Sequence, residues 1–142
     1  MSPTISCDSV YKIFGSNANK LLADSNGSVD AKQFQDAGCI VGVNNASFDV
    51  EKGEMLVVMG LSGSGKSTLL RCISRLTDAT AGKILVDGED ICLMNNKQLV
   101  ELRREKMGMV FQNFALLPHK TVIENIAFPL QVKGVSLSLI HI

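Results

Sequence analysis

The sequence lacks an excess of charge of either sign, because fourteen Lys and Arg residues balance fourteen Asp and Glu residues. A domain built mainly to hold nucleic acid normally has a basic excess, so we expect no nucleic-acid partner. No stretch approaches the roughly 18 apolar residues that a membrane span requires. The N-terminus also lacks the apolar core of a signal peptide. We therefore expect the chain to stay in the cytoplasm.

Closely spaced cysteines are also lacking. The four cysteines lie far apart and form no CxxC pair: Cys7, Cys39, Cys72 and Cys92. Disulfide frameworks and zinc sites use denser or paired spacing, so we expect free, buried thiols. With 142 residues, 46% of them hydrophobic and 20% charged, the chain has the size and composition of one globular domain.

Apolar patterning predicts strands early in the chain. Residues 4–14 are expected to form one strand, and residues 40–50 two strand segments. The polar segment 16–38 lies between them and predicts two short helices, the second capped by Ser28 and stopped by Gly38.

The middle of the chain alternates strand and helix signals. EMLVVMG, residues 54–60, is a continuous apolar run, the pattern of a strand buried on both faces of a parallel sheet. Leu69, Ile73 and Leu76 then recur at helical spacing. An Asp-Gly turn predicts a hairpin over residues 83–92.

Further signals follow the hairpin. Residues 96–106 are typical of an exposed helix, and residues 108–112 of a short buried strand that would pair beside the run at 54–60. Thr121 and Glu124 form a capping box that opens a last helix, in which a proline predicts a kink or an early stop.

The loop GLSGSGKST lies between the apolar run and the first of these helices and contains GxxxxGK[ST]. Its glycines allow a nest of backbone N–H groups around an anion, and the following helix adds its positive N-terminus. Lys66 would reach the β- and γ-phosphates of a nucleotide, and the Ser67 hydroxyl would ligate Mg²⁺. The predicted nucleotide-binding residues of the loop are Gly60, Leu61, Ser62, Gly63, Ser64, Gly65, Lys66, Ser67 and Thr68. Kinases, GTPases and ATPases all share such a loop, and a glycine-rich turn without function is the alternative.

The residues around the loop resemble the nucleotide-binding domain of ABC transporters: GLSGSGKSTLLRCISRL, AGKILVDGEDI and MGMVFQNFALLPHKTVIENIAF. The resemblance implies an α/β fold with a P-loop NTPase (RecA-like) core and an antiparallel β subdomain, incomplete in this chain. It implies ATP and Mg²⁺ as cofactors, with Lys66 and Gln112 as catalytic residues. Gln112 would be the Q-loop residue, whose amide oxygen reaches Mg²⁺ and the attacking water. The adenine would stack on Phe14, with Tyr11 as the second choice and core packing as the alternative for both.

The motif MVFQNFALLPHKTVIEN and the insertion at 16–38 are similar to the ATPases of glycine betaine and proline importers. This branch implies transmembrane permease subunits that meet the region after Gln112, and a second ATPase subunit. It also implies an extracellular or periplasmic substrate-binding protein, and a peripheral location on the cytoplasmic face of the plasma membrane. Another importer branch, such as one for amino acids, remains an alternative. So does a P-loop NTPase of another kind, such as a small kinase.

Three family motifs are absent from the sequence: an LSGGQ-like signature, an apolar strand that ends in Asp-Glu, and the switch histidine. We therefore expect residues 1–136 to be the N-terminal part of such a domain, with a helical insertion at 16–38. The parent protein would be the ATPase, whereas this chain alone would bind nucleotide without turnover. Residues 137–142, LSLIHI, are also the translation of CTG TCT CTT ATA CAC ATC, a transposon adapter end, so we expect them to be non-native.

Overall fold

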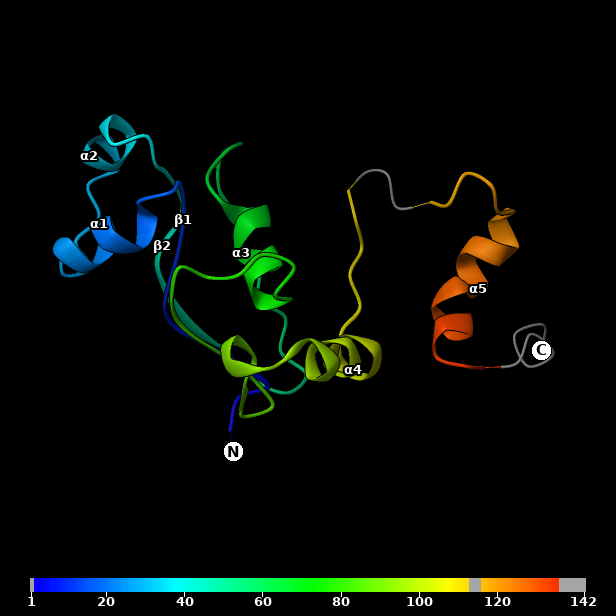
Figure 1. Cartoon of the computed structure of the whole chain (residues 1–142). Coiled ribbons are helices and arrows are strands. Elements are labelled where there is room, and N and C mark those ends of the chain that lie inside the picture. The colour runs from blue at the N-terminus through cyan, green and yellow to red at the C-terminus, as the bar shows by residue number, and fades with distance from the viewer. Residues whose placement is uncertain (1, 113–115, 136–142) are drawn as a thin grey trace. The chain divides into compact units, whose positions relative to one another are not determined.

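The computed structural model describes residues 2–112 and 116–135. The chain divides into two compact units, residues 1–99 and residues 100–142 (Figure 1). Within the described ranges, no helix is long and apolar enough to cross a membrane. The predicted non-native tail, residues 137–142, lies outside these ranges.

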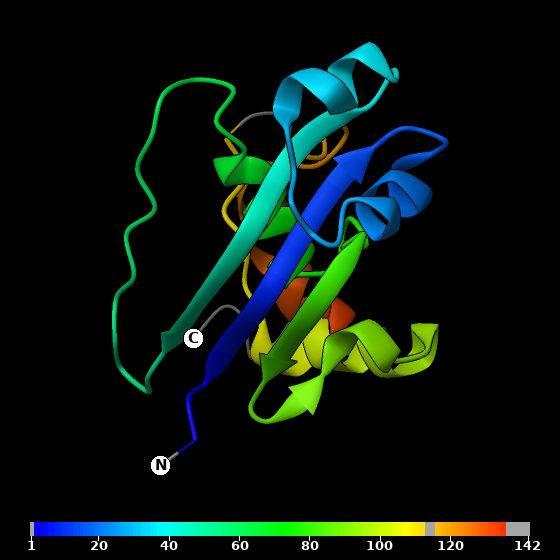
Figure 2. The same ribbon diagram turned by 90° about the vertical axis from the view of Figure 1, so that its left-hand side faces the viewer.

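The first unit is built on an antiparallel sheet with the strand order β2-β1-β3-β4 (Figure 2). The strands are β1 (Ile5–Phe14), β2 (Ile40–Val50), β3 (Ala81–Val86) and β4 (Glu89–Asp90). Asp87 and Gly88 join β3 to β4 with φ values of 49° and 82°, which suits the tight turn expected of an Asp-Gly pair. The predicted antiparallel subdomain and its hairpin are confirmed.

One correction concerns β2, which is a single strand rather than two segments. The pairing with β1 shifts between Val10↔Ala46 and Lys12↔Val43, so β2 contains an extra residue there. Asn45, within this shift, has a left-handed φ of 49°. The Asn-Asn pair therefore forms a bulge that bends the strand without ending it.

The segment between β1 and β2 contains two short helices, α1 (Ala18–Asp24) and α2 (Ala31–Asp36). They pack on one face of β1 through a buried cluster: Tyr11, Ile13, Ala18, Leu22, Phe34 and Cys39. The cap of α2 differs from our prediction, because Asp30 and not Ser28 accepts from the backbone N–H groups of Lys32 and Gln33. Ser28 lies two residues before this N-cap.

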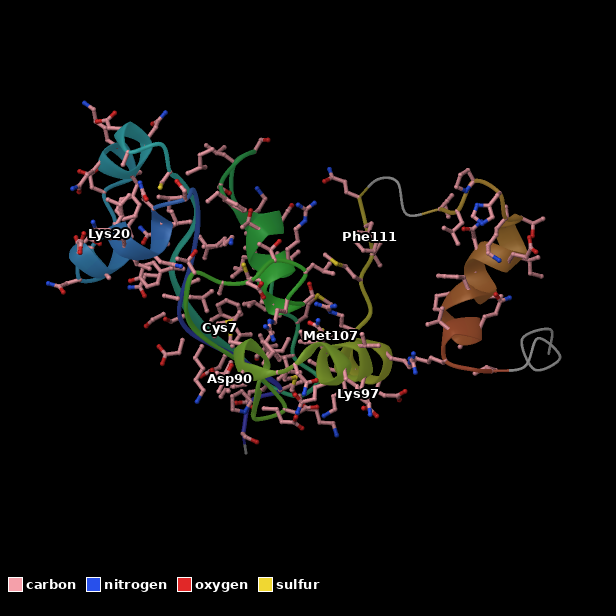
Figure 3. All side chains as sticks on the ribbon, in the orientation of Figure 1. Cys7, Lys20, Asp90, Lys97, Met107 and Phe111 are labelled. Atoms are coloured by element: carbon pink, nitrogen blue, oxygen red, sulfur yellow. The ribbon has the colours of Figure 1, made fainter. Side chains whose placement is uncertain are left out.

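Neither of the two predicted buried strands, residues 54–60 and 108–112, is a strand in the structure. No strand of the described chain pairs with either segment. Met55 and Met59 are 86% and 85% exposed, and Val110 is 99% exposed. Phe111 lies on the extended stretch that follows the helix at 96–106 (Figure 3). An apolar run becomes a central strand only where neighbours supply hydrogen bonds and cover both faces.

Helix α3 (Lys66–Ile73) follows the glycine-rich loop, and its Leu69 and Cys72 are buried. The helix ends before Leu76, which we had placed on its apolar stripe. Arg75, which follows the C-cap Ser74, has a left-handed φ of 48°, which terminates the helical geometry.

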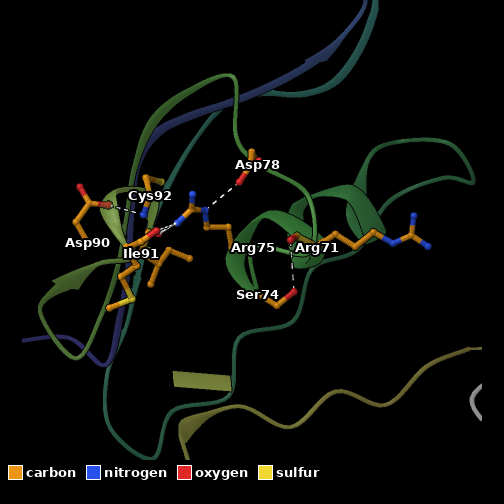
Figure 4. A network of polar contacts seen from close by, with 8 residues as sticks. Arg71, Ser74, Arg75, Asp78, Asp90, Ile91 and Cys92 are labelled. Atoms are coloured by element: carbon orange, nitrogen blue, oxygen red, sulfur yellow. Dashed lines mark hydrogen bonds and ion pairs between the residues drawn. The ribbon is translucent and has the colours of Figure 1, made fainter. Parts of the chain in front are cut away.

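Arg75 ties the end of α3 to the short 3-10 helix η1 (Ile91–Leu93) after the hairpin (Figure 4). Its guanidinium donates to the carbonyl oxygen of Ile91 at 2.7 Å and to that of Met94. It also pairs with Asp78 at 2.9 Å. Because one planar fork serves three acceptors, the helix end and the hairpin are fixed to each other.

Helix α4 (Asn96–Lys106) matches its prediction, and α5 (Val122–Val132) lies in the second unit. The capping box of α5 is present: the Thr121 hydroxyl accepts from the Glu124 N–H at 3.3 Å, and the Glu124 carboxylate accepts from the Thr121 N–H at 2.7 Å. Of the two outcomes predicted from Pro129, a kink or an early stop, the early stop is wrong, because this proline lies inside the helix. The loss of one backbone donor did not end the helix.

Candidate functional site

The glycine-rich loop runs from Gly60 into the first turn of α3. Gly63 and Gly65 have left-handed φ values of 80° and 90°, and Gly65 is the N-cap of the helix. Residues with a side chain adopt this conformation at a cost, whereas glycine does not. The loop therefore has the backbone that a nest of N–H groups at a helix N-terminus requires.

The ammonium group of Lys66 folds back over this loop. Its Nζ donates to the carbonyl oxygens of Gly60 at 2.7 Å and Leu61 at 2.6 Å, and to the Ser64 hydroxyl at 3.3 Å. All three donors of the ammonium thus have an acceptor within the loop. The positive charge is held at the loop itself, where phosphate oxygens could replace these acceptors.

A cavity of about 400 Å³ lies between β2 and the loop. Val41 and Val43 of β2, Val58 of the extended segment, and Gly60 and Lys66 of the loop contribute to its lining. The cavity is of a size that suits a small-molecule ligand. Its lining combines apolar side chains with one cation and the backbone of the loop, a combination that fits a group with a flat apolar part and an anionic part.

Gly42 of β2 is a site residue that sequence reasoning missed. A Cβ atom on Gly65 would lie 1.9 Å from the Gly42 carbonyl oxygen, so the two backbones are in direct contact. A Cβ atom on Gly42 would lie 2.9 Å from Cε2 of Phe14 and 3.0 Å from Cγ2 of Thr68. The only signal in the sequence was a glycine that interrupts an apolar strand pattern, which often marks a close approach.

The same contacts bring Phe14 beside the first turn of α3. Phe14 lies at the end of β1, and its side chain is 43% exposed. Tyr11 is buried on the insertion side instead, and its hydroxyl donates to the Gly27 carbonyl at 3.1 Å. Of the two aromatic residues proposed for a nucleobase, only Phe14 has a ring that a ligand could reach.

The remaining predicted site residues include the two Mg²⁺ ligands, Ser67 and Gln112. Ser67 is exposed in the first turn of α3, and Gln112 is an exposed residue of the second unit, so its role toward Mg²⁺ and water stays a prediction. Within the described part of the chain, no group of three His, Cys, Asp or Glu residues could hold a metal ion. The Ser67 hydroxyl is the kind of ligand that suits Mg²⁺ when phosphate oxygens hold most of the ion.

The second unit contains a separate candidate surface after Gln112. It is a groove of about 280 Å³ between the segment 116–120 and α5. Three of the apolar residues in its lining, Leu116, Val122 and Ile126, are at least 71% exposed. Leu117 and Pro118 also line it.

The side chain of Asn125 holds this groove in shape. Its amide nitrogen donates to the carbonyl oxygens of Leu117 and Lys120, both at 3.1 Å, and of Thr121 at 2.9 Å. Its amide oxygen accepts from the Leu117 N–H at 2.7 Å. A single side chain therefore fixes the loop on the first turn of α5.

Comparison with known proteins agrees with this geometry. A family model described as ABC transporter matches residues 43–140. The chain is 79% identical over 133 residues to the trimethylamine N-oxide transport system ATP-binding protein TmoW of Pelagibacter ubique (strain HTCC1062), covering 94% of this chain and 39% of that protein. It is 46% identical over 133 residues to the glycine betaine/carnitine transport ATP-binding protein GbuA of Listeria monocytogenes serotype 1/2a (strain 10403S), covering 92% of this chain and 33% of that protein.

Solved structures show the same fold. The dimeric post-hydrolysis structure of the ATP-binding cassette MJ0796, bound to ADP and Pi, superposes with a TM-score of 0.75 at 28% identity. The match covers 96% of this chain and 52% of that cassette. The chain thus spans about half of a solved cassette and 39% or less of the two transport proteins.

Proposed function

The chain belongs to the ABC transporter family, and we propose that it is the nucleotide-binding N-terminal part of an ATPase subunit that drives import of a small methylated amine. The loop with Lys66 at its centre is the observation that carries nucleotide binding. The substrate class is supported by the names of relatives that act on trimethylamine N-oxide and on glycine betaine or carnitine. These three compounds share a nitrogen that bears three methyl groups.

In this proposal each part of the site has a stated role toward ATP. The backbone of residues 62–66 and the Lys66 ammonium hold the β- and γ-phosphates, and Phe14 stacks on the adenine. Ser67 and Gln112 provide oxygen ligands to Mg²⁺, which neutralises charge on the phosphate oxygens when it is bound. Gln112 also orients the attacking water, which is a positioning role rather than a proton transfer.

The partners follow from the same proposal. The groove shaped by Asn125 receives a transmembrane permease subunit, because its exposed apolar side chains need a partner to cover them. A second ATPase subunit completes the nucleotide site across a dimer, and a substrate-binding protein delivers the amine to the permease. The parent protein would then be a peripheral protein on the cytoplasmic face of the plasma membrane.

The nucleotide part of the proposal is tested with Lys66→Ala. This change removes a charged donor, and hydrogen bonds to charged groups contribute about 1.5–3 kcal/mol, so MgATP affinity should fall by about 10- to 150-fold. Titration of the 142-residue chain with a fluorescent ATP analogue measures it. Lys20→Ala, on the exposed side of α1, is the matched control and should bind as the unmodified chain does. Equal affinity for Lys66→Ala and the unmodified chain would contradict the phosphate assignment.

The substrate class is tested in cells. The complete gene cluster, expressed in a strain that lacks uptake of methylated amines, should restore uptake of labelled trimethylamine N-oxide or glycine betaine. Competition with unlabelled carnitine and with an amino acid separates the branches. Uptake that only the amino acid blocks would reject the methylated-amine assignment and favour an amino-acid importer.

A further inference from the structure

The two faces of β1 carry different side chains at its end. Tyr11 and Ile13 belong to the buried cluster under the helical insertion. Side chains alternate along a strand, so Lys12 and Phe14 project from the opposite face. Lys12 is half-buried there, and its Nζ lies 4.9 Å from the centroid of the Phe14 ring. This distance is within the range of a cation–π contact.

We propose that Lys12 is a positioning residue for Phe14. Its ammonium covers one face of the ring and leaves the opposite face for the purine of ATP. The inference rests on the proposed function, in which Phe14 stacks on the adenine, and it adds a residue that the loop motif does not contain.

The surroundings of Phe14 show why the ring needs such support. It lies at the last position of β1 and is 43% exposed. The ring lies close to Gly42, which has no side chain to hold it. An aromatic ring at a strand end loses side-chain entropy when a base stacks on it. A cation that already fixes one face removes part of this cost, and it favours a ring orientation in which the other face is open.

If Lys12 orients Phe14, its effect on binding affinity should depend on whether the ligand contains a base. A lysine that only attracted phosphate would show no such dependence. A lysine that attracted phosphates would act on every polyphosphate alike. A lysine that orients Phe14 acts only on ligands with a base to stack. Binding of MgATP and of magnesium tripolyphosphate, which has no base, therefore separates the two roles.

The experiment compares Lys12→Met, which keeps the apolar stem, with Lys12→Arg, which keeps the cation. Both ligands are titrated into the 142-residue chain by calorimetry. We expect Lys12→Met to weaken MgATP binding by about two- to fivefold, the range of an exposed cation–π contact, and to leave tripolyphosphate binding unchanged. Lys12→Arg should retain MgATP affinity. Unchanged tripolyphosphate binding also shows that the variant is folded.

A double-mutant cycle with Phe14→Ala completes the test. If Lys12 acts through Phe14, Lys12→Met has no further effect on MgATP once the ring is absent. An equal loss of both ligands in Lys12→Met, no loss of either, or a full effect without the ring would each overturn the inference. Failure of the proposed function is seen separately, as a Phe14→Ala or Lys66→Ala variant that binds MgATP like the unmodified chain.

Discussion

At the scale of single residues, the close approach of Gly65 to Gly42 leaves no room for a side chain at Gly65. Gly65→Ala places a methyl group 1.9 Å from a backbone oxygen at a φ of 90°. Gly53→Ala is the matched control, because Gly53 has a φ of 82° with nothing within 4 Å. The control should cost about 1–2 kcal/mol from backbone conformation alone. Gly65→Ala should lower the urea midpoint further and weaken MgATP binding, whereas equal midpoints would show that the close contact costs nothing.

The buried thiol of Cys7 makes the free energy of unfolding depend on pH in the alkaline range. Burial, with a smaller contribution from the nearby Cys92, raises the pKa of Cys7 from 9.0 to about 11. Between these two values the unfolded thiol loses its proton and the folded thiol keeps it, so the free energy of unfolding falls as pH rises. Below about pH 9 both states are protonated and the effect vanishes. Urea unfolding at pH 8 and pH 10.5 measures the fall, and Cys7→Ala should reduce it; an identical fall in the variant would assign it to other groups.

At the scale of elements, Arg75 joins α3 to the hairpin. Its side chain is only 20% exposed and binds two carbonyl oxygens and Asp78. Arg75→Met keeps the apolar stem but leaves these acceptors without their charged donor, which should cost about 1.5–3 kcal/mol. Thermal unfolding measures the loss, and amide exchange should accelerate in β3 and β4. Arg71→Met on the exposed face of α3 is the control, and an equal effect of both changes would exclude a special role for Arg75.

Elements with a local signal were predicted well from the sequence. The Asp-Gly turn, the Thr121 capping box and the two insertion helices each depend on residues a few positions apart. The strand predictions for segments 54–60 and 108–112 were wrong for the opposite reason. A buried strand depends on neighbouring strands, and no described strand flanks either segment. The apolar residues of these two segments indicate that they suit a buried strand. They do not indicate whether the described chain supplies the neighbouring strands that would bury them.

The residues of the candidate site also differ in whether their signal in the sequence is local or depends on tertiary packing. The loop from Gly60 to Thr68 could be singled out from the sequence because its signal is the spacing of residues within one short segment, and its role in nucleotide binding stays a prediction. Gly42 was not, since its importance arises from the approach of β2 to the loop. The sequence favoured Phe14 over Tyr11 only through a resemblance, and the packing of the insertion supplies the physical reason, because it buries Tyr11 and leaves Phe14 exposed.

At the scale of the whole molecule, we expect the 142-residue chain to bind MgATP without turnover. Its sequence contains no Asp-Glu strand to polarise the attacking water and no signature motif to close a second nucleotide site. Phosphoryl transfer depends on positioning and charge, and these groups supply much of both. Phosphate release with MgATP should equal that of Lys66→Ala, which controls for contamination. Turnover that Lys66→Ala abolishes would contradict the prediction and revive another P-loop activity.

The position of the strands in the sequence determines when the sheet can form during synthesis. All four strands of the sheet lie within residues 5–90, so a ribosome that adds about 5–20 residues per second releases them within roughly 5–20 s. The sheet can form around β1 at that moment, while the run from Met55 to Met59 pairs with no strand among the described residues. An exposed apolar stretch of this kind is what holding chaperones bind. We expect a nascent chain to be captured at this run after its sheet has formed, and a version with Val57→Lys to escape capture.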